Sequence, residues 1–468
     1  MLPWPLKALV DSRPHEIVAF AVAALPMLTA GLLRLRPRHR ARAGVRRGAT
    51  VLRYRLRLGA GRRGGCGRIT LAGIPVPTPD ESKHFKVLGT TGTGKSTAIR
   101  EILAAALGRG DRAVVTDPDG GYVGRFFRAR RGDVILNPFD PGSLRWDWRE
   151  EMHNPYDAEL LASALVPASP DAAGEEWRGY ARTFLAAVIR RSWEIGPRPG
   201  GDLWRLLAFA PIAQLRPLVA GSAAQPFLDP DNARMFGSIR SVAASAVAAL
   251  EHVHAQRARR FSVRRWIRAA EPAGVLFMPY KATQIAALRT LISAWMRLAV
   301  FEAMNADEGR DQRLWFVVDE LDALGAIDGL KDALARLRKF GGRCVLGFQS
   351  VAQVSSTYGH GSAQTIVENC SNTLILRCGG SENGGTSQFA SRLIGDREVR
   401  RRQTGRSRDH AGAIGSRASR RSTNVSDQTV VETAVLASEI ERLPDLHGYL
   451  KLASSPVWRE ARLRVGAC

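Results

Sequence analysis

A glycine-rich loop at residues 89–97 limits what this chain can fold into more than any other segment. Its residues are Gly89, Thr90, Thr91, Gly92, Thr93, Gly94, Lys95, Ser96 and Thr97. Glycines at these spacings let the backbone turn tightly with its N–H groups directed inward, which makes a cradle for phosphate oxygens. The Lys95 ammonium is expected to reach the β and γ phosphates, and the Ser96 hydroxyl to bind magnesium. The loop therefore predicts a nucleoside triphosphate site that takes ATP and Mg²⁺.

Both flanks of the loop fit this interpretation. Residues 84–88 (His-Phe-Lys-Val-Leu) form a short strand-like run that enters the loop, and residues 97–107 are rich in helix formers. A helix that starts here directs its positive N-terminal end at the bound phosphates. The competing interpretation is a glycine turn that binds nothing. It does not explain why the loop and both flanks match.

An apolar strand followed by two acids predicts the rest of a hydrolytic site. Residues 314–318 read Leu-Trp-Phe-Val-Val and are followed by Asp319 and Glu320. Asp319 is expected to hold magnesium through a hydroxyl or a water, and Glu320 to orient and polarise the attacking water. With this pair the chain is predicted to be an ATP hydrolase and not only a nucleotide-binding protein.

A glutamine follows another apolar run, at residues 343–348. The Gln349 amide could contact the γ phosphate or the attacking water and report hydrolysis to the rest of the domain. A glutamine without a role fits the sequence equally well, so both interpretations stay open.

Short apolar runs alternate with helical segments along most of the chain. Such near-continuous apolar strands predict an α/β fold, with a parallel sheet covered by helices on both faces. The predicted strands after the loop are residues 113–117, 133–137, 274–278, 314–318, 343–348, 373–377 and 448–452.

Two segments interrupt this alternation. Residues 154–270 carry alanine-rich helical patterns and no convincing strand, which predicts an all-helical insertion that returns the chain to the same sheet. Its tryptophans, Trp177, Trp193 and Trp204, are expected in the core and not on a base-stacking platform. Residues 395–427 are polar, rich in arginine and weakly periodic, which predicts a mobile loop.

The charge of the chain is strongly basic and unevenly spread. The formal net charge is +24, and the segment from Arg34 to Arg68 holds thirteen arginines and no acid. A second basic stretch runs from Arg392 to Arg421. Such fields attract polyanions, either nucleic acid or the anionic face of a membrane. The five cysteines form no C-x-x-C pair, which excludes a zinc site of that kind and indicates a reduced environment.

An uncharged run near the N-terminus predicts a membrane anchor. Residues 17–33 would form about 25 Å of helix, at the short end of what spans a bilayer. The arginines that follow at once hold the bulk of the chain in the cytoplasm by the positive-inside rule. A cleaved signal peptide would carry its charges before the apolar run and a cleavage site after it. A buried core helix is the other alternative.

Taken in order, these motifs resemble the conjugative coupling proteins, the TraD and TrwB group of DNA-translocating ATPases that serve type IV secretion systems. The resemblance covers residues 84–465. The matching segments are the phosphate loop, Asp117–Gly121, Leu136–Asp140, Val318–Leu321, Arg338–Gly342 and Gly347–Ser350.

The resemblance implies a homo-hexameric ring with a RecA-like motor, an all-helical insertion and a transmembrane helix in the bacterial inner membrane. It implies partners as well: DNA bound mostly without sequence preference, a relaxase, and components of a secretion channel. In such rings a neighbouring subunit supplies an arginine that offsets charge on the transferred phosphoryl group. Arg338 matches that position best, with Arg343 and Arg377 as alternatives.

The resulting domain prediction has four parts. Residues 1–34 are the anchor, 35–80 a basic linker with the start of the motor, 81–153 and 271–468 the RecA-like motor, and 154–270 the insertion. The linker includes a glycine-rich joint at residues 58–67. Family members commonly have two spans and a long acidic tail, neither of which is expected here. Two alternatives compete with conjugative transport: another hexameric translocase, for chromosome segregation, repair or protein secretion, and a membrane DNA receptor that does not hydrolyse ATP.

Overall fold

The computed structural model describes residues 44–53, 67–169, 171–197, 201–269, 274–305, 312–381, 384–410 and 419–465. The predicted anchor (residues 1–34) and all but the last residue of the glycine-rich joint lie outside these ranges. Within them, no helix has both the length and the apolar character needed to cross a membrane. The chain divides into two compact units, one of residues up to Arg47 with Glu398–Glu432, the other of Gly48–Arg397 with Thr433–Cys468.

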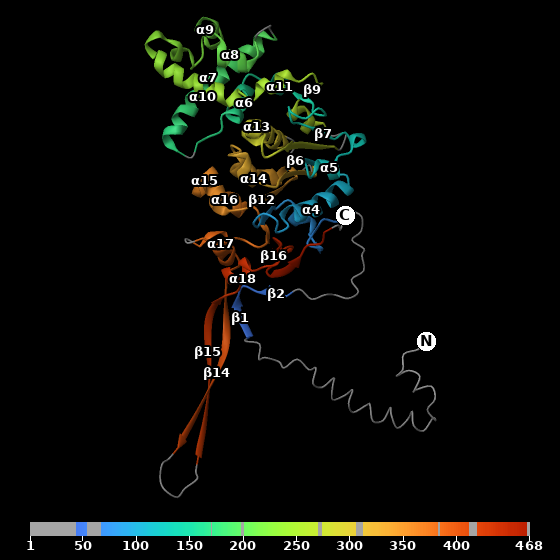
Figure 1. Ribbon diagram of the computed structural model, residues 1–468, viewed down its shortest axis with the longest axis vertical. Helices are drawn as coiled ribbons and strands as arrows, with labels where there is room; N and C mark the ends of the chain where they lie inside the picture. Colours follow the sequence, from blue (N-terminus) through green and yellow to red (C-terminus); the bar gives the residue numbers. More distant parts are fainter. Residues whose placement is uncertain are drawn as a thin grey trace, which may run out of the picture. The chain divides into compact units, whose positions relative to one another are not determined.

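The larger unit contains a ten-stranded sheet in the order β2-β17-β16-β13-β5-β12-β11-β6-β10-β7. Figure 1 labels β2, β6, β7, β12 and β16 of this sheet. Every strand predicted from the sequence is present in it. The bounds are β2 Val51–Leu52, β5 Phe85–Leu88, β6 Arg112–Pro118, β7 Val134–Ile135, β10 Val275–Tyr280, β11 Leu314–Val318, β12 Gly342–Phe348, β13 Asn372–Ile375, β16 His447–Lys451 and β17 Trp458–Arg462.

The sheet is parallel from β13 to β7, which confirms the predicted α/β core. The edge with β16 and β17 departs from the prediction. β16 pairs antiparallel with β13, and β17 pairs antiparallel with β16. The connection between β16 and β17, residues 452–457, is too short for the crossover that a parallel neighbour requires.

Alternate strand residues serve two separate cores, as expected for a sheet covered on both faces. In β11, Leu314, Phe316 and Val318 belong to one core, whereas Trp315 and Val317 belong to the other. The first core includes helices α13 (Ile285–Ala303), α14 (Leu330–Leu337), α15 (Val351–Tyr358), α16 (His360–Asn369) and α17 (Gly385–Ile394). The second includes helix α4 (Lys95–Gly108) and the paired strands β3 (Thr70–Leu71) and β4 (Ile74–Pro75).

The insertion is helical, as predicted, apart from one short strand. Its helices are α6 Asp157–Leu165, α7 Ala172–Ile195, α8 Leu203–Phe209, α9 Ile212–Val219, α10 Ala233–Val247, α11 Leu250–Ala255 and α12 Val263–Arg268. The exception is β9 (Arg260–Phe261), which pairs with β8 (Arg145–Trp146). A two-residue strand leaves no readable period in the sequence.

The prediction that all three insertion tryptophans lie in the core is wrong for one of them. Trp193 and Trp204 are partly buried and pack against the core, whereas Trp177 is exposed.

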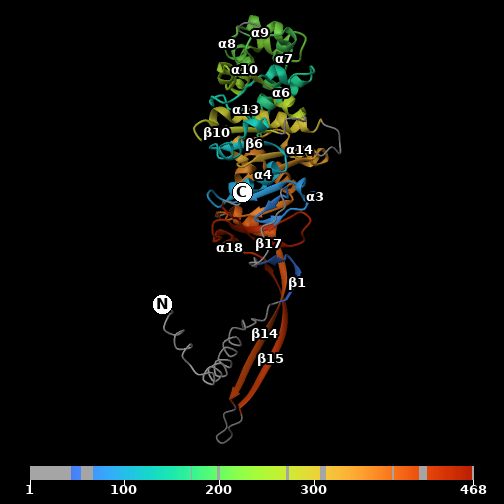
Figure 2. The same cartoon turned by 90° about the vertical axis from the view of Figure 1, so that its right-hand side faces the viewer.

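The smaller unit contains a three-stranded sheet of order β1-β14-β15. β1 is Gly44–Gly48, β14 is Asp396–His410 and β15 is Ser419–Thr433 (Figures 1 and 2). The mobile loop predicted for residues 395–427 is therefore wrong for most of that segment. Sheet pairing joins backbone groups, so strands with exposed polar side chains on both faces need not show an apolar period. Ion pairs such as Arg400–Asp427, at 3.0 Å, link β14 to β15.

Candidate active site

Three neighbouring strands place the predicted site residues, apart from Arg338, at one edge of the sheet. The phosphate loop follows β5, Asp319 and Glu320 follow β11, and Gln349 follows β12. These strands are parallel and adjacent, in the order β5-β12-β11. Their carboxyl ends therefore meet, at the edge where open α/β sheets bind ligands. The residue types had predicted that these segments act together, but not the strand order that brings them together.

Backbone conformation shows why the loop needs its glycines. Gly92 and Gly94 have φ angles of 79° and 113°, in the left-handed region that favours glycine. A Cβ on Gly89 would lie 2.7 Å from Thr93 Oγ1. Helix α4 starts at Lys95, so its free N–H groups face the loop and favour an anion there.

The Lys95 side chain is buried and lies along the loop. Its Nζ donates to the carbonyl oxygens of Gly89, at 2.8 Å, and Thr90, at 3.2 Å. Burial lowers the pKa of the Lys95 ammonium, and the charges of Asp319 and Glu320 oppose this shift. The loop is closed by its own polar groups as well, since Thr93 Oγ1 donates to Thr90 O at 2.7 Å.

One carboxylate oxygen of Asp319 accepts hydrogen bonds from two neighbouring hydroxyls, and the other is placed to bind a hard cation. Ser96 Oγ donates to Asp319 Oδ2 at 2.6 Å, and the Tyr122 hydroxyl donates to the same oxygen at 2.9 Å. The other oxygen, Oδ1, is buried and has no hydrogen-bond partner within the described part of the chain. A buried carboxylate oxygen without a partner costs free energy unless a cation or a donor meets it. Oxygen ligands of this kind suit Mg²⁺.

Gly347, on β12, lets Asp319 occupy this position. A Cβ on Gly347 would lie 2.0 Å from the backbone oxygen of Asp319. Leu321 N donates to Gly347 O at 3.1 Å, which joins the two strand ends. The sequence had identified Gly347 only as part of a matching segment. Its physical role is to admit the neighbouring backbone.

Glu320, Gln349 and Thr91 form a chain of hydrogen bonds. Gln349 Nε2 donates to Glu320 Oε1, and Thr91 Oγ1 donates to Gln349 Oε1 at 3.2 Å. Burial raises the pKa of the Glu320 carboxyl, with a further rise from the nearby Asp319, while the bond from Gln349 lowers it. Gln349 thus links the acid to the phosphate loop, which favours the first of its two open interpretations.

Two tyrosines near the acids were missed by the sequence analysis. Tyr122 is held by Asp117, whose carboxylate accepts from the N–H groups of Tyr122 and Val123 at 2.9 and 2.7 Å. The hydroxyl of Tyr280, at the end of β10, is buried without a partner among the described residues. Asp117–Gly121 had been recognised as a matching segment, so its next residue, Tyr122, was the available signal.

The arginine candidates lie in three different surroundings. Arg338 is exposed in the 3-10 helix η6 (Arg338–Phe340), which precedes β12, so it lies at the opposite end of that strand from Gln349. Arg343 is buried and pairs with Glu81 at 3.1 Å. Arg377 pairs with Asp445 at 2.6 Å. The ion pair with Glu81 therefore holds Arg343 within its own subunit. Of the three candidates, only Arg338 is exposed.

Comparison with known proteins identifies relatives of this chain in sequence and in fold. The family model described as the type IV secretion-system coupling protein DNA-binding domain matches residues 68–463. Coupling protein TraD of Escherichia coli (strain K12) is 29% identical over 390 residues, which make up 82% of this chain and 53% of TraD. A conjugal transfer protein TraG of Escherichia coli is 24% identical over 333 residues, 62% of this chain and 52% of TraG. The chain thus spans about half the length of these curated relatives.

Solved structures of the plasmid coupling protein TrwB have the same fold. The complex with the ATP analogue ADPNP superposes with a TM-score of 0.76 and 30% identity, over 90% of this chain and 94% of that one. The complex of TrwB with ADP and Mg²⁺ gives a TM-score of 0.74 and 31% identity, over 86% of this chain and 90% of that one.

Proposed function

This chain belongs to the type IV secretion-system coupling protein family, and on that premise we propose that it is an ATPase that moves conjugative DNA to a type IV secretion channel. One observation carries the hydrolytic part of the proposal. Lys95, Asp319 and Glu320 meet at one edge of the sheet, where Ser96 binds Asp319 and Gln349 joins Glu320 to the loop.

Each residue of the site has a defined part in hydrolysis. The loop N–H groups and Lys95 bind the phosphates of ATP, and Ser96 and Asp319 hold the magnesium. When bound, the cation offsets negative charge on the phosphates. Glu320 orients the attacking water, and its raised pKa makes it a better proton acceptor than an ordinary carboxylate. Gln349 fixes the position of Glu320 relative to the loop.

The DNA part of the proposal rests on family and charge. The matched family model is a DNA-binding domain, and the chain carries a formal net charge of +24. Binding through phosphates is largely independent of sequence and weakens steeply with salt. A relaxase-bound single strand is the proposed cargo.

We also propose a homo-hexamer anchored in the bacterial inner membrane. Residues 17–33 would be its transmembrane helix, and the bulk of the chain would be cytoplasmic. Arg338 would complete the site of the next subunit, which is consistent with its exposure at the far end of β12.

ATP hydrolysis by the full chain, with and without single-stranded DNA at low and high salt, tests the proposal. We expect stimulation by the strand at low salt that is lost at high salt. Hydrolysis without any stimulation would favour an ATPase that moves protein. A protein that binds ATP and DNA without turnover would be a receptor.

A further inference from the structure

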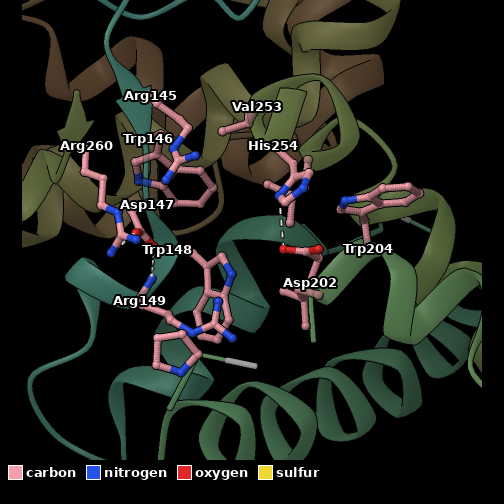
Figure 3. Close-up of a pocket in the computed structure, with 13 residues that line it drawn as sticks. Arg145, Trp146, Asp147, Trp148, Arg149, Asp202, Trp204, Val253, His254 and Arg260 are labelled. Atoms are coloured by element: carbon pink, nitrogen blue, oxygen red, sulfur yellow. Dashed lines mark hydrogen bonds and ion pairs between the residues drawn. The ribbon is translucent and has the colours of Figure 1, made fainter. Parts of the chain in front are cut away.

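A cavity lies at the base of the helical insertion, away from the phosphate loop. It has a volume of about 290 Å³ and contains none of the residues assigned to hydrolysis (Figure 3). Several separate segments surround it: β8 with the turn that follows, the start of α8, helix α11, and β9. The lining residues used below are Trp148, Arg149, Arg145, Arg260, Trp204 and His254.

Two tryptophans give this cavity aromatic walls. Trp148 is buried and Trp204 is half-buried, and they come from different elements. The Trp204 indole nitrogen is at the end of the ring that faces His254 (Figure 3). This N–H is buried and finds no acceptor in the part of the chain that the structure describes. The cavity thus has aromatic walls, with an unused but solvent-inaccessible donor beside them.

Arginines outnumber acids around the cavity. Arg260 pairs with Asp147 at 3.4 Å, and His254 pairs with Asp202 at 3.0 Å. Arg149 stacks over Trp148, its guanidinium carbon 4.4 Å from the ring centre, and its buried Nε has no partner among the described residues. Burial lowers the pKa of this guanidinium, and the charges of Asp147 and Asp202 oppose the shift. Arg145 adds a third guanidinium. The excess of cationic donors favours an anionic ligand.

We propose that this cavity binds one nucleotide of single-stranded DNA, with its base against the tryptophans and its phosphate on the arginines. The inference rests on the proposed function and adds a specific contact point for the strand. Stacking on aromatic side chains beside basic residues is how proteins hold single strands without sequence preference. The volume is near the lower limit of ligand pockets, about 300 Å³, which suits a single nucleotide.

Other anions fit the same walls less well. A peptide carboxylate would use the arginines but has no base to stack on Trp148 or Trp204, each of which already has one arginine over its ring. A free nucleotide has the same chemistry as one unit of a strand. The strand is favoured because Arg260 is largely exposed, with 56% of its side-chain surface accessible, and can meet a flanking phosphate outside the cavity.

The floor of the cavity connects it to the motor. Trp146 packs edge-on against Trp295 of α13, with ring centres 6.0 Å apart. Its Nε1 donates to Glu151 Oε1 at 2.7 Å, and Glu151 also accepts from the N–H groups of Val263 and Arg264. A ligand in the cavity would therefore rest on a rigid platform that joins the insertion to helix α13 of the motor.

Anisotropy of a labelled short oligothymidylate bound to the full chain tests the inference. We expect Trp204→Ala, and the double variant Arg145→Ala with Arg260→Ala, each to weaken binding about tenfold. Trp177→Ala and Arg191→Ala, at exposed positions on α7 that do not line the cavity, should bind as the parent chain does. On a strand with abasic sites, the Trp204→Ala effect should vanish and the arginine effect should remain.

Parent-like binding by both cavity variants would overturn the inference. So would binding of dTMP that does not displace the strand, or displacement of the strand by an acidic peptide alone. If Trp204→Ala unfolds, the double arginine variant still decides, because Arg145 and Arg260 retain solvent exposure. Failure of the proposed function would give a different result from failure of this inference. If only the proposed function fails, the strand binds in the cavity but does not stimulate ATP hydrolysis by the parent chain.

Discussion

Replacing Gly347 by alanine would show how closely the sheet holds the catalytic acids. The new Cβ would lie 2.0 Å from Asp319 O and 2.8 Å from Asp319 C. Both neighbours are backbone atoms, so no side chain can rotate away. Strands β11 and β12 would have to separate by about 1.5 Å at this point to reach normal contact.

The cost can be worked out from the contacts involved. Overpacking of this kind costs about 1–3 kcal/mol. Loss of the hydrogen bond from Leu321 N to Gly347 O adds about 1 kcal/mol. We therefore expect the free energy of unfolding of Gly347→Ala to fall by about 2–4 kcal/mol. Because Asp319 moves relative to Ser96, we also expect kcat for ATP hydrolysis to fall about 100-fold.

Denaturant unfolding and steady-state ATP hydrolysis measure the two effects. Gly237→Ala is the matched control, because a Cβ there meets nothing within 4 Å and the residue lies inside helix α10. Alanine at this helical position should be neutral or stabilising by about 0.5–1 kcal/mol. A Gly347→Ala protein with parental stability and kcat would refute the reasoning.

Three further perturbations test other parts of the structure. Tyr122→Phe removes a hydroxyl that donates to Asp319 Oδ2, so hydrolysis should require several-fold more Mg²⁺. Tyr280→Phe loses a hydroxyl without a described partner and should need no more Mg²⁺ than the parent. A magnesium titration of the hydrolysis rate compares the two variants. Because the pKa of Glu320 is raised, the rate of hydrolysis should decline as the pH falls through this pKa. Gln349→Leu removes a hydrogen bond that lowers the pKa of Glu320, so a pH–rate profile of this variant should show the decline at higher pH. Burial lowers the pKa of His84 to about 4, so the folded protein holds this imidazole neutral. Its full contribution to the free energy of unfolding is present above pH 6.5, and roughly 3 kcal/mol of that free energy is lost as the pH falls from 6.5 to 4. Unfolding of His84→Gln at several pH values should show a flatter dependence than the parent, and equal slopes would contradict this.

The parallel core and the phosphate loop were predictable because their signals are local. Each strand of the parallel sheet is a short apolar run, and the loop from Gly89 to Thr97 is continuous in sequence. The acids Asp319 and Glu320 were also found locally, at the end of such a run. Their approach to Ser96 follows once the strands are parallel and adjacent, since equivalent ends then meet.

Other features depend on contacts across the fold that no local pattern records. Tyr122 acts through a hydrogen bond to Asp319, which is far from it in the sequence. Gly347 matters because the backbone of Asp319, at the end of the neighbouring strand, lies directly against it. Strands β14 and β15 are rich in polar residues, and they pair with each other through their backbones, so no apolar period marks them in the sequence. Trp204 was placed in the core by type and does pack against it, but it also lines a cavity that several segments assemble.

Transfer of DNA by cells that depend on this chain tests the central claim most directly. Lys95→Ala removes the ammonium that lies in the phosphate loop, and Lys331→Ala, on the surface of α14, is the matched control. We predict that the control transfers DNA as the parent chain does and that Lys95→Ala abolishes transfer while the protein remains folded. Transfer that survives Lys95→Ala would contradict an ATP-driven motor.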